Sequence, residues 1–511
     1  MISTSKKLIG ALAVTAAALT GITQLSTAQS GGGMGPSSSQ SSYVVPTIPG
    51  VVITSILTVG DSVNNKPDGT PYRMVGIPDG LGAFDNNDGT FSVLINHEIP
   101  EGLGAVREHG ANTSFVSRWV IRKSDLTVLN GDDLVEQVAT WDPVTSSFNP
   151  LAQGVRMGRL CSADLPPASA FFNATTNLGF SDGRIYMNGE EVGPEGRAFG
   201  HVVNGSSDGD TYELPYLGKF SWENSVAHPA TGDKTVVMGM DDGAGGQVYL
   251  YLGDKTNAGN PVERAGLNNG NLYGIRVSGV VLEDRNNGIP SGTAFDLHNL
   301  GNVRNTTGAQ LELNSDAGAV TEFLRPEDGA WDPQNPNHFY FVTTDRFDTF
   351  KNPGTPANQI GRSRLWRLRF VDVTNPTLGG QIDMLLDGTE PHQMLDNFTI
   401  RRGQVFLQED VGNQAHIGKL WRYSIAGDNL NLIAQHDSNR FLTGAPNFLT
   451  QDEESSGIID VSDILGAGWY LLDVQAHYRG DVDRDGDTEA VDLELVEGGQ
   501  LLALFQPDRR R

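Results

Sequence analysis

Six segments of the chain repeat one pattern, in which a short apolar run ends in polar or acidic residues and a polar loop follows. The apolar runs cover residues 91–95, 185–187, 236–240, 339–342, 405–407 and 469–472. In at least four copies a Gly- or Ser-led apolar segment returns after the loop. Such runs, bounded by turn residues, are typical of buried strands.

One such hairpin is marginally stable alone and must bury its faces against neighbours. A ring of antiparallel blades achieves this and leaves only short strand edges. The copies have diverged too far for a simple solenoid, so the repeat is inferred from pattern rather than from identity. The sequence therefore predicts an all-β architecture with few helices.

Carboxylates at the same end of each inner strand would converge on one mouth of the channel. The polar and acidic residues at these strand ends are Asn96, His97, Glu98, Glu190, Glu191, Asp241, Asp242, Asp345, Glu409, Asp410 and Asp473. Because side chains alternate along a strand, Asn96 and Glu98 point to one face and could share a metal. The alternative is that these residues are ordinary polar turns at the rim.

The N-terminus has the pattern of an export signal. Lys6 and Lys7 precede an apolar stretch at 8–19, and the small residues Ser26, Thr27 and Ala28 form a cleavage site. There is no twin arginine, which favours the general secretory route. We expect a signal peptide at 1–28, a disordered linker at 29–45, a folded β-domain at 46–508 and a periplasmic or extracellular location.

The chain has 511 residues and a net charge of −26. Nucleic acid is therefore not expected as a partner. After the N-terminus no apolar stretch approaches the roughly 18 residues of a membrane span. The acid excess fits divalent cations, above all calcium, which prefers carboxylate and carbonyl oxygens. Solubility alone would explain it equally well.

Cys161 is the only cysteine, so no disulfide can form within the chain. Such a thiol is either an inert buried side chain or a functional ligand or nucleophile. Arg156 and Arg159 lie nearby, and cations favour the thiolate. Glu223, close behind two aromatic residues, is a second candidate: either a metal ligand or the ion-pair partner of Lys219.

The segment at 325–332 is dense in functional residue types. Pro326 has a fixed φ and biases Arg325 towards an extended conformation. Arginine offers a planar fork suited to phosphate oxygens, and Glu327 could hold a metal that bridges the same phosphate. The alternative is a surface Arg–Glu pair in a turn.

Residues 480–494 have the spacing of a calcium-binding EF-hand-type loop. Its candidate ligands are Asp481, Asp483, Asp485, Asp487 and Asp492, with Gly486 at the sixth position. The loop interrupts the last hairpin, so we interpret it as a structural clip. The chain also lacks a P-loop, a G-x-S-x-G elbow, an H-E-x-x-H motif and a dinucleotide-binding fingerprint. The remaining inventory favours metal-assisted hydrolysis over covalent acyl transfer.

The order of these motifs resembles that of PhoX-type alkaline phosphatases. The matching phrases are NHE at 96–98, a lone Cys161, GEE at 189–191, GKFSWE at 218–223, DD at 241–242, RPEDGAWDP at 325–333, QED at 408–410 and DVQAH at 473–477. The resemblance spans residues from about 50 to 506. It implies a six-bladed β-propeller that removes phosphate from phosphomonoesters with iron and calcium at the channel mouth.

The resemblance also implies roles for single residues. Arg325 matches the family's phosphate-holding arginine, and Glu327 and Glu223 match metal-binding glutamates. Cys161 matches an iron-bound thiolate, and Asn96 with Glu98 matches the first metal-binding strand end. Glu190, Glu191, Asp242, Asp345 and Glu409 are weaker matches. We expect a monomer acting on small phosphate esters. The alternatives are a non-catalytic, calcium-stabilised binding propeller, and a phytase- or phosphodiesterase-like enzyme on the same scaffold.

Overall fold

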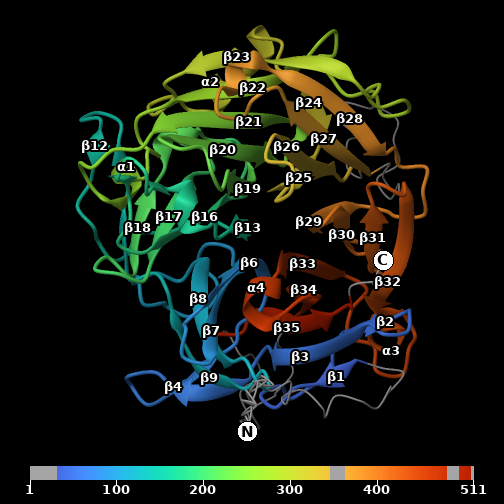
Figure 1. The fold of residues 1–511 in the computed structure, drawn as a ribbon. Coiled ribbons are helices and arrows are strands. Elements are labelled where there is room, and N and C mark those ends of the chain that lie inside the picture. Colours follow the sequence, from blue (N-terminus) through green and yellow to red (C-terminus); the bar gives the residue numbers. More distant parts are fainter. Residues whose placement is uncertain (1–31, 346–362, 480–493, 508–511) are drawn as a thin grey trace, which may run out of the picture.

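Six blades, each built on four antiparallel strands, stand in a ring around one axis (Figure 1). The computed structural model describes residues 32–345, 363–479 and 494–507. The innermost strands are β6 (Pro78–Asp85), β13 (Leu160–Asp164), β19 (Trp222–Ala227), β25 (Pro326–Trp331), β29 (Leu395–Arg401) and β33 (Glu453–Asp460). We number the blades 1 to 6 in this order. The fold is a six-bladed β-propeller, which confirms the all-β prediction.

The remaining blade strands follow outward from the centre. Blade 1 continues with β7 (Thr90–His97), β8 (Phe115–Arg122) and β9 (Val128–Asp133). Blade 2 continues with β16 (Arg184–Glu190), β17 (Ala198–Val203), β18 (Asp210–Glu213) and β10 (Gln137–Ala139). Blade 3 continues with β20 (Lys234–Asp241), β21 (Ala244–Asp254) and β22 (Asn271–Val277). Blade 4 continues with β26 (His338–Thr343), β27 (Arg364–Phe370) and β28 (Gly380–Leu386). Blade 5 continues with β30 (Gln404–Glu409), β31 (Lys419–Ser424) and β32 (Asn429–His436). Blade 6 continues with β34 (Trp469–Arg479) and β35 (Glu497–Phe505).

The six apolar runs of the sequence fall in β7, β16, β20, β26, β30 and β34. These are the second strands of the blades, whereas the prediction took them for inner strands. That assignment is wrong by one strand. The innermost strands carry polar residues and glycines, so they lack the continuous apolar run on which the prediction relied. β21, β27, β31 and β35 are the return strands of blades 3 to 6.

The ring closes through the N-terminal segment. β3 (Val52–Thr58) pairs with β35 and is the fourth strand of blade 6, while β1 (Gly33–Met34) pairs with β3. β2 (Val44–Pro46) pairs with β32 in blade 5. The prediction of a disordered linker is therefore wrong for residues 32–45. Tyr43 and Val44 are buried between blades 5 and 6, which anchors this segment.

The hydrophobic core lies between the blades. Each of six buried apolar clusters takes residues from two neighbouring blades. Between blades 1 and 2, for example, Leu94 and Val116 pack with Tyr186 and Phe199. Face-to-face packing of twisted sheets removes both faces of each blade from water.

Shorter elements complete the described chain. β23 (Thr293–Gly301) joins β22 to β28 and so links blades 3 and 4 at their outer edges, and β24 (Glu322–Leu324) pairs with β21. Small hairpins are β4 (Ser62–Asn65) with β5 (Pro71–Arg73), β11 (Trp141–Asp142) with β12 (Ser147–Phe148), and β14 (Phe172–Asn173) with β15 (Leu178–Gly179). The α-helices are α1 (Pro261–Arg264), α2 (Gly308–Ala317), α3 (Ser438–Phe441) and α4 (Ser462–Leu465). The 3-10 helices are η1 (Ala168–Ala170), η2 (Pro215–Leu217) and η3 (Pro376–Leu378).

Two predictions concern segments at the limits of the described chain. The export signal at 1–28 and Asp481, Asp483, Asp485, Asp487 and Asp492 of the calcium loop lie outside the described residues. The strands on either side of that loop, β34 and β35, form the expected antiparallel pair. Over the part of the chain that the structure describes, no helix has the length and apolar character needed to cross a membrane.

Candidate metal centre

Each blade presents one carboxylate or thiol, a side chain that could bind a metal, at the second residue of its innermost strand. These six residues, hereafter the ring, are Asp79, Cys161, Glu223, Glu327, Asp396 and Glu454. The first five are at most 9% exposed. The propeller thus repeats one local feature six times around its axis and gathers five carboxylates and one thiol there.

Local backbone irregularity explains why the second residue faces the channel. In blades 1 to 5 the pairing of the innermost strand with its neighbour shifts register just after its first residue, for example between Pro326 and Gly329. Such bulges bend a strand and redirect its side chains. In three blades the residue before the strand has a left-handed φ: 51° at Ile77, 60° at Arg325 and 47° at Met394.

The conformation of Arg325 corrects one prediction. Pro326 was expected to hold Arg325 extended, but its φ is +60°. The peptide amides of Thr344 and Asp345 donate to the carbonyl oxygens of Arg325 (3.1 Å) and Leu324 (3.0 Å), which fixes the chain in this turn. A non-glycine residue in this region is strained, and such strain persists only where the surroundings impose it.

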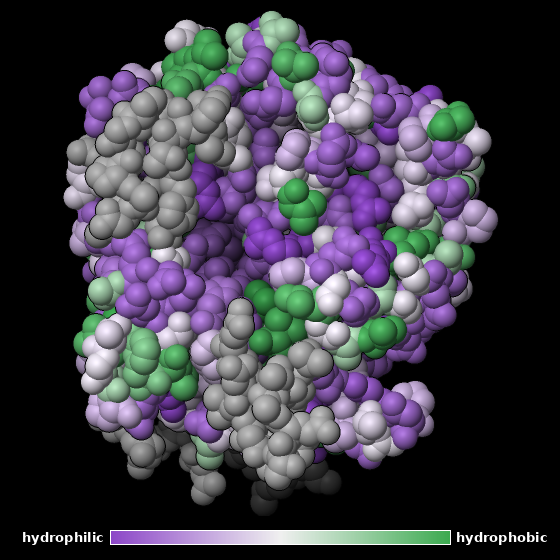
Figure 2. Space-filling model, turned by 180° about the vertical axis from the view of Figure 1, so that it is seen from behind, coloured by the Kyte–Doolittle hydropathy of each residue, from purple (hydrophilic) through white to green (hydrophobic). Residues whose placement is uncertain are grey.

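The ends of the second strands supply a further set of carboxylates. Glu98, Glu191, Asp242 and Asp410 line a pocket of about 350 Å³ together with five members of the ring. Figure 2, viewed from the side opposite to Figure 1, shows a central hollow surrounded by hydrophilic residues. The prediction that acidic strand ends converge on one channel mouth therefore holds for Glu98, Glu191, Asp242 and Asp410.

Where two acids are adjacent, only the second lines the pocket, because successive side chains point to opposite faces. The first acid is bound by the protein. Both Glu190 oxygens accept from the Arg197 guanidinium, at 2.6 and 2.9 Å. Glu409 accepts from Trp421 Nε1 (2.7 Å) and the Gln393 amide (2.8 Å). Glu190 and Glu409 thus form hydrogen bonds within their own blades and stabilise them.

Asn96 and Asp345 also lie outside the pocket lining. Asn96 Nδ2 donates to the Cys161 carbonyl oxygen (2.6 Å), while its Oδ1 accepts from Tyr186 (3.1 Å) and Asn188 (2.9 Å). The amide therefore supports the backbone at Cys161 instead of facing the pocket beside Glu98. Asp345 is buried and pairs with Arg285 at 3.0 Å.

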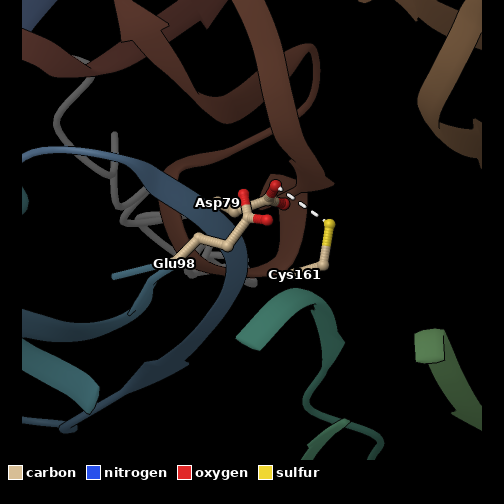
Figure 3. Close-up of side chains that lie close together, drawn as sticks. All are labelled: Asp79, Glu98 and Cys161. Carbon is tan, nitrogen blue, oxygen red and sulfur yellow. Dashed lines mark hydrogen bonds between the residues drawn. The ribbon is translucent and has the colours of Figure 1, made fainter. Parts of the chain in front are cut away.

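The ring and the pocket carboxylates form overlapping groups of three ligand atoms that lie within 4.8 Å of one another. These groups are Asp79–Glu98–Cys161, Cys161–Glu191–Glu223, Glu223–Glu327–Asp396 and Asp396–Asp410–Glu454. Figure 3 shows the first of them, in which Asp79 of β6, Cys161 of β13 and Glu98, one residue beyond β7, lie close together, with Cys161 Sγ 3.5 Å from Asp79 Oδ2. Because neighbouring groups share a residue, the candidate metal sites lie side by side.

The donor atoms fit metal ions. Asp79 Oδ1 and Glu223 Oε1 are buried and have no hydrogen-bond partner in the described parts of the chain. Burial raises the pKa of Asp79, and the charge of Glu98 raises it further. Burial and then the Asp410 charge raise the pKa of Asp396 to about 8. Cations at these groups would replace the missing partners and offset the repulsion.

Cys161 belongs to the same network. Burial, followed by the charge of Asp79, raises the pKa of its thiol well above the usual value. A metal ion deprotonates a coordinating thiol outright, so the side chain fits a ligand better than a free nucleophile. Carboxylate oxygens suit calcium, whereas a thiolate suits softer metals such as iron.

Two arginines also line the pocket. Arg325 Nη2 lies 3.1 Å from Glu327 Oε1 and 2.8 Å from Asp242 Oδ2. Arg159 contacts Glu98 (2.5 Å) and Glu191 (2.8 Å). Each arginine precedes its ring residue by two positions. Glu327 is buried, so the alternative of a surface Arg–Glu pair is excluded.

Burial and pairing exclude the ion-pair alternative for Glu223. Trp222 is 1% exposed and stacks on Phe220. Lys219 lies 3.8 Å from Glu195, so its ion-pair partner is not Glu223. Gln475, which sequence reasoning did not select, donates to Asp79 (2.9 Å) and Glu98 (3.1 Å) and ties blade 6 to blade 1.

Sequence reasoning also missed Asp79, Asp396 and Glu454. It named Asp410 with Glu409 at one strand end but kept only Glu409 as a candidate ligand, although side-chain alternation could have selected Asp410. Asp79 precedes Gly80 and Asp396 precedes Asn397, as Glu223 precedes Asn224. Such acid–Gly and acid–Asn pairs are also common in turns, so the sequence alone could not have selected these residues.

Comparison with known proteins agrees with this architecture. Residues 169–457, more than half of the chain, match the family model of the alkaline phosphatase PhoX. A search of curated proteins finds no match.

Among solved structures, Pseudomonas fluorescens PhoX in complex with vanadate, a transition-state analogue, is 12% identical with a TM-score of 0.58, covering 90% of this chain and 95% of that one. A putative 6-phosphogluconolactonase from Bacteroides uniformis is 10% identical with a TM-score of 0.33, covering 71% and 87%. The first likeness shows the shared fold, and the second is too weak to carry an argument. With the family match over more than half of its length, the chain belongs to the PhoX alkaline phosphatase family of phosphoric ester hydrolases.

Proposed function

We propose that this protein is an exported phosphatase that hydrolyses phosphomonoesters with calcium and iron held in the pocket over the ring. The observation that carries the proposal is the ring itself: five carboxylates and one thiol, one from each blade, converge below an arginine fork. No such convergence is needed to stabilise a propeller, because the cores between blades already do so.

The proposed ligands follow from the four overlapping groups. Asp79, Glu98 and Cys161 would hold one ion, and Cys161 with Glu191 and Glu223 would hold a neighbouring one. The groups on Asp396 offer oxygens only, which favours calcium there. When bound, the ions would stabilise the negative charge that develops on the phosphoryl oxygens.

Arg325 has the role of phosphate clamp in this proposal. Its guanidinium reaches the pocket with a planar fork, and Asp242 and Glu327 fix its orientation. A phosphate between the ions and Arg325 would accept charge-assisted hydrogen bonds, which are stronger than neutral ones. Asp242 thereby acts through Arg325 as a positioning residue and also offers an oxygen to the pocket.

Export and the calcium clip belong to the same proposal. Export is supported by the charged and apolar N-terminal pattern at 1–28, and the clip by the aspartate spacing at 480–494. A calcium ion bound there would tether the connection between β34 and β35. Both stay predictions of the sequence.

The test combines metal analysis of the purified mature protein with hydrolysis assays. We expect calcium and iron to co-purify, and turnover of p-nitrophenyl phosphate to be lost on chelation and restored by calcium with iron. A panel including phytate and a phosphodiester separates the alternative activities. Metal content without turnover on any phosphate ester would overturn the proposal and leave a binding propeller.

A further inference from the structure

His477 lies in β34 of blade 6 and lines the pocket together with Glu497 of β35. His477 Nδ1 lies 2.5 Å from Glu497 Oε2, and the side chains are 29% and 27% exposed. Because Glu497 holds Nδ1, the other ring nitrogen, Nε2, is left for a ligand in the pocket. An imidazole fixed by a carboxylate in this way keeps one orientation.

The charge of His477 follows from its neighbours. Burial alone would lower the pKa of the imidazole, but the hydrogen bond and charge of Glu497, with the charges of Asp452 and Asp410, raise it to about 9. These three carboxylates come from β35, the segment before β33 and the end of β30. Among these carboxylates Glu497 has the largest effect, so its hydrogen bond to Nδ1 favours the protonated imidazole.

His477 belongs to a different blade from the strands that the two arginines of the pocket precede. Arg159 precedes the innermost strand of blade 2 and Arg325 that of blade 4, so the two arginines flank Glu223 in blade 3. Blade 6, which carries His477, stands on the opposite side of the channel (Figure 1). Of the described residues that line the pocket, His477 carries the sole imidazole, and an arginine does not release its proton at neutral pH.

From this arrangement we propose that His477 Nε2 donates the proton to the leaving alcohol, with Glu497 as its positioning residue. The inference rests on the proposed phosphatase function. The bond between phosphorus and the ester oxygen breaks while a water oxygen bonds to phosphorus. The ester oxygen takes the Nε2 proton and leaves as an alcohol. The water gives a proton to solvent, and the neutral imidazole regains one.

The role defines the substrate class. An aryl phosphate such as p-nitrophenyl phosphate expels a stable anion and needs no proton at the leaving oxygen. An alkyl phosphate expels a strongly basic alkoxide and does need one, and a positioned acid contributes roughly 100-fold or more to such a step. The site is therefore built for monoesters of aliphatic alcohols, such as glycerol phosphate or sugar phosphates.

The experiment measures kcat and KM of the metal-loaded protein on glycerol phosphate and on p-nitrophenyl phosphate. We expect His477→Gln to lower kcat on glycerol phosphate by about 100-fold and to leave kcat on p-nitrophenyl phosphate nearly unchanged. Glu497→Gln should move the alkaline limb of kcat on glycerol phosphate to lower pH. His416→Gln is the matched control, because His416 pairs with Glu409 at 2.9 Å outside the pocket lining.

Equal loss on both substrates, or a change in KM alone, would overturn the proton-donor role. If His477→Gln does not fold, kcat of the wild-type protein is measured across a series of phosphate esters. A kcat that falls steeply as the leaving alcohol becomes more basic refutes a proton donor. No turnover of any ester by the wild type would instead refute the proposed function itself.

Discussion

Arg325 and Asp242 form a bidentate ion pair across two blades, with Nε and Nη2 of the arginine each 2.8 Å from a carboxylate oxygen. Arg325 precedes the innermost strand of blade 4, and Asp242 follows the second strand of blade 3. Two parallel hydrogen bonds fix the plane of the guanidinium. The fork is thus oriented before any substrate binds, at a residue whose backbone is also held in a strained turn.

The first prediction concerns this fork. Arg325→Ala removes a donor to the developing phosphoryl charge, so we expect turnover of phosphate esters to fall by more than roughly tenfold. Arg325→Lys keeps the charge but not the planar geometry and should recover only part of the loss. Steady-state kinetics on p-nitrophenyl phosphate measures both variants.

Arg276→Ala is the matched control, because Arg276 forms the same bidentate pair with Asp296 on the exposed surface of blade 3. It should leave turnover unchanged. If Arg325→Ala keeps wild-type turnover, the clamp role is refuted, whatever its effect on stability.

The second strands could be predicted because their apolar runs are continuous and end in acids, as in residues 236–242. The innermost strands could not be predicted in this way, because polar residues and glycines interrupt their apolar pattern. β6 reads PDGLGAFD and β33 reads EESSGIID, with Asp79 and Glu454 at the ring positions. Cys161 and Glu327 were found on other grounds, a lone thiol and an Arg–Pro–Glu phrase.

Which residue of an acidic pair faces the pocket depends on tertiary packing. Glu190 and Glu191 are chemically alike, but Glu190 forms an ion pair with Arg197 whereas Glu191 lines the pocket. The sequence shows both acids and does not show Arg197 beside the first of them. His477 likewise became interpretable only when β34 and β35 placed it beside Glu497.

A second prediction concerns the thiol. Cys161 is the soft ligand of the ring, so Cys161→Ser should lower the iron content of the purified protein by at least about half while calcium is retained. Elemental analysis measures both metals. Ser162→Ala alters the neighbouring hydroxyl, which lies 3.3 Å from Asn397, and should not change the iron content. Unchanged iron in Cys161→Ser would exclude the thiolate as a ligand.

A third prediction uses the other end of the channel. Asp164 lines a separate pocket of about 220 Å³ with Asp328, and burial followed by the Asp328 charge raises its pKa to about 7. An acid whose pKa is raised in the folded state destabilises the fold progressively as pH rises from about 4 to 7. Asp164→Asn should therefore raise the melting temperature by a few degrees at pH 8 and have little effect at pH 4.

Asp88→Asn is expected to show the opposite sign. Hydrogen bonds from Thr90 lower the pKa of Asp88, so its ionised form stabilises the fold above the ordinary carboxyl pKa. Its replacement should lower the melting temperature slightly at pH 8. A fall in melting temperature for Asp164→Asn at pH 8 would contradict the assignment of Asp164 as a destabilising carboxylate.

The last prediction concerns removal of the metals. The ring brings Asp79, Glu223 and Glu327 into a buried site in which each acid's pKa is raised by burial and by neighbouring carboxylates. Chelation should therefore lower the melting temperature, and added calcium should restore it, because an ion that binds only the folded state stabilises it by mass action. Asp396→Asn removes one of the repelling charges and should reduce the loss on chelation. The double variant Asp481→Ala with Asp483→Ala separates the clip from the ring: it should lose calcium yet keep turnover. A melting temperature that does not respond to chelation in the wild type would mean that the ring holds its carboxylates neutral rather than through metal ions.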